Sequence, residues 1–304
     1  MAERAPDCAV KRQRSAVVES ALTNVDVVSQ LAAFLEAKDL CQVKATCKAL
    51  GSANDYGAAI NGLSMVDEAA RLVYEDASGE EKAMLPRYAG ESWTELYHHL
   101  LMLRSRLTFE QLVGRSVEYR LGDKASVQGK KFNGMRGFST AICGNHIMRA
   151  GKHWATFTSS SGIDYSQTVG VVRPLPGWET RGLNDFSPAF SQFYADLLHE
   201  RTDRWDGDVH FCYFYIEDGR CAWLDWTGEF PPSNILWDGR DDYDGDCKTL
   251  GMLLDLDEGT LSVYQNGRRV GTLKDGLAGE YCWIAGFKSK GDVSIQRGYN
   301  LNTL

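Results

Sequence analysis

Apolar side chains alternate with other residues along positions 250–273, and this alternation predicts three successive antiparallel strands. Turns are predicted at Asp257–Gly259 and at Asn266–Gly267. Asn-Gly suits a type I′ turn, in which both central residues need positive φ, because Asn tolerates that conformation and Gly adopts it without steric cost. The segment is expected to be a β-meander with these side chains on its buried face: Leu250, Met252, Leu254, Leu256, Leu261 and Val263.

The N-terminal part of the chain follows a helical period instead. Apolar residues recur at i, i+3 and i+4 steps between positions 27 and 35, and a second short helix is expected to begin near Asp39, a candidate N-cap. Further helices are predicted at Met65–Tyr74 and at Ser92–Leu103, the last with Ser92 as its cap. Residues 1–17 are polar and aperiodic, and we expect them to form a disordered lead-in.

The pattern changes near residue 113. From Gly114 onward, glycine-bearing turns and alternating strands replace the helical stripes, and seven of the eight tryptophans lie in this part. The sequence therefore predicts an α+β multidomain protein, with a helical region at 18–113 followed by an all-β antiparallel sandwich at 114–304.

Composition excludes several classes of protein. A net charge of -8 argues against binding nucleic acid or a membrane surface, which both rely on clustered Lys and Arg. The sequence has no N-terminal apolar signal and no apolar segment of membrane-spanning length. Eight cysteines are scattered without C-x-x-C spacing and no glycosylation sequon occurs, which favours a cytoplasmic or nuclear protein with reduced thiols.

The sequence carries no signature of catalysis. It has no Gly-x-Ser-x-Gly elbow, no phosphate-binding Gly-rich loop and no His-Glu-x-x-His, so we expect neither enzymatic activity nor a cofactor. His98 and His99 are adjacent on a predicted helix and point 100° apart, so they cannot share one metal ion. The acidic loop 238–246 lacks the spacing of an EF-hand, and a solvated turn is favoured over a calcium site.

Several segments after residue 113 together resemble a SPRY domain, a β-sandwich module that binds other proteins. Gly151–Trp154, Thr168–Val172, Gly219–Trp223 and Tyr281–Phe287 are similar to strands of that family, in the same order as the family has them. The segment from Gly245 to Gly267 is similar to the family's C-terminal pattern of Gly, Asp and Asn-Gly residues. The resemblance departs at Pro174–Arg204, which is longer and more helix-like than a sandwich loop usually is.

A second resemblance lies in the helical region. Phe34–Leu40 followed by Cys47–Leu50 is similar to the middle of an F-box, although Leu50 stands where the family usually has Trp. This resemblance implies an exposed apolar face that binds the small linker protein of a cullin-type ubiquitin ligase. Packing entirely within a local helical bundle is the alternative. The candidate interface residues are Leu31, Phe34, Leu35, Leu40 and Val43.

The two resemblances together imply a non-enzymatic adaptor that recruits a ubiquitin ligase and holds a substrate protein. SPRY domains grip short peptides with loops, and aromatic residues beside turns are common anchors at interfaces. Two alternatives stay open: a SPRY scaffold unconnected to ubiquitin, and a glycan-binding or hydrolytic sandwich. The candidate peptide-binding residues are Trp226, Trp237, Asp238, Asp241, Asp242, Tyr243 and Asp244, whose acidic members would favour basic peptides.

Overall fold

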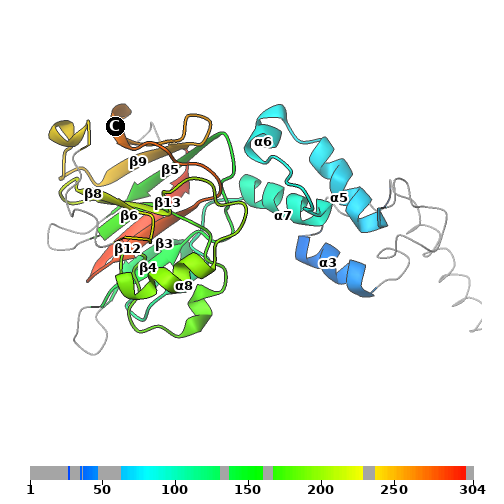
Figure 1. Cartoon of the computed structure of the whole chain (residues 1–304), viewed down its shortest axis with the longest axis horizontal. Coiled ribbons are helices and arrows are strands. Elements are labelled where there is room, and N and C mark those ends of the chain that lie inside the picture. Colours follow the sequence, from blue (N-terminus) through cyan, green and yellow to red (C-terminus); the bar gives the residue numbers. More distant parts are fainter. Residues whose placement is uncertain are drawn as a thin grey trace, which may run out of the picture. The chain divides into compact units, whose positions relative to one another are not determined.

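The computed structural model describes residues 27, 35, 37–46, 63–130, 137–159, 167–228 and 237–298 (Figure 1). The chain divides into two compact units, residues 1–104 and residues 105–304. Among the helices that the structure describes, none is long and apolar enough to cross a membrane. The predicted lead-in at 1–17 and most of the helix predicted at 27–35 lie outside the described residues.

The first unit contains the helices α3 (Ala37–Thr46), α5 (Met65–Glu75), α6 (Gly79–Met84) and α7 (Trp93–Arg104). Serine side chains cap α5, α6 and α7, because Ser64, Ser78 and Ser92 accept the backbone N–H three residues further on. The two helices predicted at 65–74 and 92–103 are confirmed. The short helix expected to begin near Asp39 is α3, which begins at Ala37, so Asp39 lies in its first turn and is not its N-cap.

Helix α7 contributes to both hydrophobic clusters of this unit. Tyr97 joins the first cluster, and its hydroxyl donates to the carbonyl oxygen of Leu35. Leu96 joins the second, which also contains Leu100 and Leu103. The first cluster consists of Leu40, Met65, Val66, Ala69, Ala70 and Tyr97, and it joins α3, α5 and α7.

The second unit is a sandwich of two antiparallel sheets, as predicted. The six-stranded sheet has the order β1-β4-β12-β6-β7-β8, and the seven-stranded sheet has the order β11-β10-β9-β5-β13-β3-β2. The strands are β1 (Gln111–Val113), β2 (Val117–Arg120), β3 (Asp123–Gly129), β4 (Ser139–Ile142), β5 (Lys152–Thr158), β6 (Gln167–Val172), β7 (Phe211–Tyr215), β8 (Cys221–Leu224), β9 (Thr249–Asp255), β10 (Thr260–Gln265), β11 (Arg268–Lys274), β12 (Cys282–Phe287) and β13 (Gly291–Arg297).

The predicted β-meander is confirmed as β9, β10 and β11. Leu254 pairs with Leu261 and Met252 with Val263, and all four side chains are fully buried between the sheets. Asn266 and Gly267 have φ values of 49° and 78°, as a type I′ turn requires. Leu256, expected on the buried face, is only partly covered because β9 ends at Asp255.

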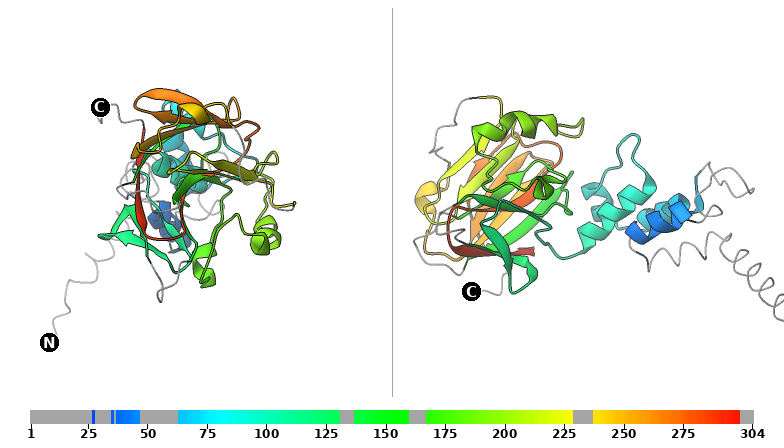
Figure 2. Two further views of the ribbon diagram at one scale, coloured as in Figure 1. Left: turned by 90° about the vertical axis from the view of Figure 1, so that its left-hand side faces the viewer. Right: turned by 90° about the horizontal axis from the view of Figure 1, so that it is seen from below.

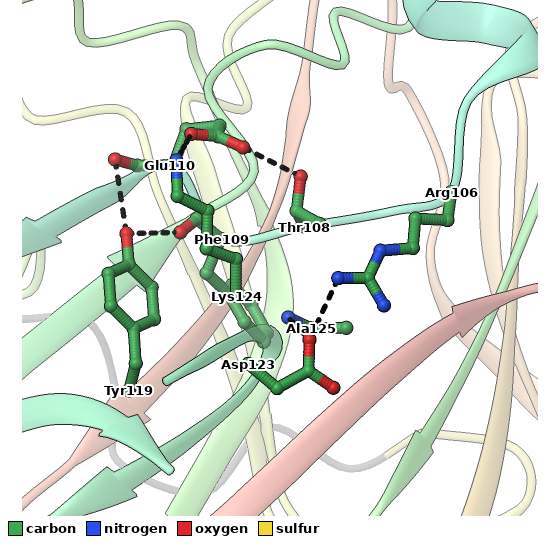
Figure 3. A network of polar contacts seen from close by, with 8 residues as sticks. All are labelled: Arg106, Thr108, Phe109, Glu110, Tyr119, Asp123, Lys124 and Ala125. Atoms are coloured by element: carbon green, nitrogen blue, oxygen red, sulfur yellow. Dashed lines mark hydrogen bonds and ion pairs between the residues drawn. The ribbon is translucent and has the colours of Figure 1, made fainter. Parts of the chain in front are cut away.

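The segment before β1 belongs to the sandwich, and this places the division between the units at Arg104, ahead of the predicted boundary near 113. Figure 3 shows how polar contacts hold the segment to the β2–β3 hairpin. The Tyr119 hydroxyl donates to the carbonyl oxygen of Phe109 at 2.7 Å, and the Lys124 ammonium contacts the Glu110 carboxylate at 2.6 Å. The Phe109 ring is itself fully buried in the core between the sheets.

The segment 174–204, called the insertion below, packs on the outer face of the six-stranded sheet. It contains the 3-10 turns η2 (Trp178–Arg181) and η3 (Ser191–Phe193) and the helix α8 (Tyr194–His199), which confirms its predicted helical character. In Figure 2 these elements gather on one side of the strands. They enclose a second hydrophobic core in which Trp178, Phe186 and Leu197 meet the strands.

Candidate interaction site on the six-stranded sheet

The outer face of the six-stranded sheet carries successive rows of side chains across β4, β12, β6 and β7. Register places Thr140, Gly286, Thr168 and Tyr215 in one row. The next row holds Ile142, Ile284, Gly170 and Tyr213. A third row holds Cys282, Val172 and Phe211, followed by Leu224 on β8.

The insertion covers only one end of this face. The third row is buried in the core that the insertion forms, together with Ile142 and Ile284 of the second row. The first row forms the floor of a cavity of about 330 Å³, a size that suits one or two side chains of a ligand. Thr168, Tyr215 and Gly286 are partly exposed there, whereas Thr140 is buried and its hydroxyl donates to the carbonyl oxygen of Phe186. The floor has no room for a larger residue at Gly286, because a Cβ atom there would lie 2.3 Å from the Thr168 hydroxyl oxygen.

Aromatic rings form the walls of this cavity. Phe138, which precedes β4, meets Phe190 of the insertion edge to face, with ring centroids 4.7 Å apart. Tyr213 and Tyr215 line the opposite side from β7, and both are half-buried. Such rings offer large contact area with little conformational freedom to lose on binding.

Two cations stand at the cavity. The Arg220 guanidinium lies over the Tyr215 ring, 4.7 Å from its centroid, and also contacts the Asp218 carboxylate at 2.6 Å. The Lys288 ammonium lies 5.5 Å from the centroid of Phe138, and its side chain is exposed. Among the described residues that line the cavity there are two cations and no carboxylate. The site is therefore suited to a ligand with apolar and acidic groups.

The two tyrosines keep their protons at neutral pH. Burial raises the pKa of Tyr213 well above its ordinary value, and the neighbouring Tyr215 raises it further. Burial also raises the pKa of Tyr215, although the positive charge of Arg220 opposes this effect. Both phenols therefore remain neutral and can donate or accept hydrogen bonds at the cavity.

Two of the predicted peptide-binding residues are interior supports. Trp226 is 1% exposed, and its indole N–H donates to the carbonyl oxygen of Pro188 at 2.9 Å, which anchors the insertion just before Ala189 and Phe190. Trp237 is 7% exposed, and its indole N–H donates to the carbonyl oxygen of Gly219, the residue before Arg220. The expectation that these tryptophans present their rings at the surface is wrong.

Tyr243 and Asp238 lie on the other side of β7 from the cavity. Tyr243 packs edge to face on Phe214, whose side chain points into the core between the sheets. Asp238 accepts the backbone N–H of Thr272 at 2.6 Å and ties the acidic loop to β11. Asp241, Asp242 and Asp244 are exposed, so a contact between them and a basic peptide stays a prediction.

Sequence reasoning missed the residues that line the cavity, although β7 carried a signal. Its sequence Phe-Cys-Tyr-Phe-Tyr has an aromatic residue at every position of one strand face and another, Phe214, on the opposite face. A strand of this kind is covered on both faces, which indicates a packed layer outside the sandwich. The row formed with Thr140 and Gly286 could not be read from the sequence without the strand order.

The candidate interface for the ligase linker is only partly described. Leu40 is 1% exposed and lies at the centre of the first helical cluster, so the expectation that its side chain is available to a partner is wrong. Leu35 and Val43 are half-buried against the same cluster. Leu31 and Phe34 lie outside the described residues.

Solved structures that are similar to this chain include SPRY domains. The SPRY domain of human HERC1 matches with 15% identity and a TM-score of 0.37, over 62% of this chain and 99% of that chain. The PSpry domain of TRIM65 matches with 15% identity and a TM-score of 0.37, over 66% and 95%. A human SPRY domain matches with 13% identity and a TM-score of 0.34, over 62% and 99%. No family model and no curated protein matches the chain. Identities and TM-scores this low transfer no function, and they give no evidence for an F-box.

Proposed function

We propose that this chain is a non-enzymatic protein-interaction adaptor whose sandwich binds an acidic peptide segment with an aromatic or aliphatic anchor. One observation carries the proposal: a partly exposed row of the six-stranded sheet lies between aromatic walls, with Arg220 and Lys288 beside it. The anchor side chain would occupy the floor formed by Thr140, Thr168 and Gly286. None of the six cysteines that the structure describes is joined in a disulfide, which supports a cytoplasmic or nuclear location.

The charge of the ligand is the point at which this proposal differs from the expectation raised by the acidic loop. Lys288 would repel basic peptides and pair with acidic side chains, whereas the Asp218 carboxylate already offsets part of the charge of Arg220. Lys288 is exposed beside the cavity, so its charge should raise the rate at which an acidic peptide associates. This rate falls as salt screens the charges. Phe190 and Tyr213 would supply contact area to the anchor, as aromatic residues do at the centres of interfaces.

Fluorescence anisotropy with labelled synthetic peptides tests this function. The probes are peptides with one Phe or Leu flanked by Asp and Glu, and the same peptides with Lys in place of the acidic residues. We expect the acidic set to bind and the basic set not to bind. Phe190→Ala should weaken binding by about 2 kcal/mol or more, as loss of an anchoring contact does. Lys288→Glu should weaken it about tenfold and reduce its dependence on salt.

Lys290→Glu is the matched control, because Lys290 is also exposed and lies only two positions away but does not line the cavity. Thermal melting of each variant separates a loss of binding from a loss of folding. Equal effects of Lys288→Glu and Lys290→Glu, or tighter binding of the basic peptides, would place the ligand elsewhere. Binding to a glycan array without any peptide binding would favour the carbohydrate-binding alternative.

We further propose that the helical unit recruits the linker protein of a cullin-type ubiquitin ligase. The support is the F-box-like spacing of Phe34–Leu40 and Cys47–Leu50, together with the partial exposure of Leu35 and Val43. Co-precipitation of purified linker protein by the full chain tests this role. Val43→Asp should abolish the capture, and Ala45→Asp, at an exposed position of α3, should preserve it. If the wild-type chain captures no linker protein, the ligase role is contradicted and the alternative of a scaffold unconnected to ubiquitin is favoured.

A further inference from the structure

A cluster of two carboxylates and one imidazole lies at the start of α7 in the helical unit. Glu91 precedes the helix, Glu95 lies in its first turn, and His99 follows one turn later. Glu95 and His99 are four residues apart, so their side chains lie on the same face of the helix. One ligand atom from each of the three residues lies within 4.8 Å of the others.

Two members of this cluster are removed from water. Glu91 is 2% exposed and His99 is 8% exposed. A buried carboxylate is costly unless a cation or hydrogen bonds offset the loss of hydration, and a second carboxylate nearby raises that cost. The backbone N–H of Tyr88 donates to the Glu91 carboxylate at 3.2 Å. The Arg87 guanidinium donates to the backbone carbonyl of Glu91 at 3.0 Å and stacks on the ring of Trp93.

We propose that Glu91, Glu95 and His99 bind a divalent transition-metal ion, with Zn²⁺ the best match. An imidazole nitrogen and carboxylate oxygens are ordinary zinc ligands, and three protein ligands leave one tetrahedral position for water. The positive charge of the ion would offset both carboxylates. His98 takes no part, because adjacent helical residues point 100° apart. The signal in the sequence is the Glu-x-x-x-Glu-x-x-x-His spacing, which is missed when His98 and His99 are considered as a pair.

Bound metal would fasten the connection between α6 (Gly79–Met84) and α7 (Trp93–Arg104) to the first turns of α7. Among its described residues, the helical unit has two small hydrophobic clusters. Small units with limited cores are commonly stabilised by a structural metal, because the binding free energy adds to the folding free energy. The proposed site is independent of the cavity on the sandwich and of the function assigned to it.

Titration calorimetry of the chelator-treated full chain with ZnCl₂, paired with thermal melting, tests the site. We expect one equivalent of Zn²⁺ to bind and to raise the melting temperature of the helical unit. Loss of an outer partner of a metal ligand typically weakens metal binding by roughly 10- to 100-fold. Glu95→Gln and His99→Gln each remove a ligand itself, so each should weaken Zn²⁺ binding by more than that. Glu95→Gln keeps the shape of the side chain, so it remains informative if His99→Gln folds poorly.

His98→Gln is the matched control and should leave Zn²⁺ binding unchanged. Equal losses in His98→Gln and His99→Gln would overturn the proposal, because the ion would then be held by general surface groups. Zinc binding that survives Glu95→Gln would overturn it as well. The proposal would also be overturned if Zn²⁺ had no effect and stability instead changed with pH near the pKa of histidine. In that case a protonated His99 would be the cation that offsets the carboxylates.

Discussion

Replacing Leu254 by alanine is expected to lower the free energy of unfolding of the sandwich by about 2 to 5 kcal/mol. Leu254 lies on β9, between β10 and β5, and its side chain is fully buried between the two sheets. Truncation leaves a cavity that the neighbouring strands cannot fill, because hydrogen bonds on both sides fix their positions. Urea unfolding followed by tryptophan fluorescence measures the change, since seven of the eight tryptophans lie in this unit.

Leu121→Ala is the matched control for this experiment. Leu121 lies in the turn between β2 and β3 with 98% of its surface exposed, so the same truncation removes almost no buried area. We expect a change within about 0.5 kcal/mol, as for other surface substitutions. Similar losses at Leu121 and Leu254 would contradict the arrangement of the sheets.

Replacing Leu40 by aspartate is expected to unfold the helical unit. The Leu40 side chain is enclosed by α5 and α7, so the new carboxylate would be buried without a partner. An uncompensated buried charge costs about 3 to 5 kcal/mol, which is a large fraction of the stability of a small unit. Thermal melting followed by circular dichroism at a helix-sensitive wavelength measures the loss.

Cys41→Asp provides the comparison, because Cys41 is the next residue of α3 and is exposed. It introduces the same charge into the same helix, and we expect it to melt close to the wild-type temperature. If Leu40→Asp also melts like the wild type, the Leu40 side chain faces solvent and is free to meet a partner protein. That result would restore the interface that the F-box resemblance implies.

The strands could be predicted where local chemistry specifies them. In the meander, a two-residue period and an Asn-Gly turn set both the register and the buried face, and the structure has both. Helix α7 was equally predictable, because Ser92 caps it and its apolar residues follow the helical period. Each of these signals lies within a few residues of the element that it specifies.

The cavity could not be predicted, because its floor comes from residues that are distant in the sequence. Thr140, Thr168, Tyr215 and Gly286 become neighbours only through the strand order of the sheet. A turn beside an aromatic residue was a misleading signal. Trp226 and Trp237 stand next to turns, yet their indole N–H groups donate to backbone carbonyls in the interior. Proximity to a turn does not determine the direction of a side chain.

The helical region shows a different limit of sequence reasoning. A periodic apolar stripe indicates that one helix face is shielded from water, but it does not indicate whether the same chain or another protein covers that face. Leu40 and Val43 belong to one such stripe on α3, and the structure separates them, since Leu40 is fully covered and Val43 only in part. Only the positions of α5 and α7 make that distinction.

The insertion makes recognition adjustable without disturbing the sheet beneath it. It supplies Ser187, Ala189 and Phe190 to one side of the cavity, while backbone pairing between strands fixes the floor. The segment itself is anchored, because the Phe186 ring is fully buried and its backbone N–H donates to the carbonyl oxygen of Phe138. Side chains at Ser187, Ala189 and Phe190 can be exchanged without altering the backbone pairing of the sheet. Evolution or protein engineering could therefore retune ligand choice here by substitution, leaving the thermodynamic foundation of the sandwich in place.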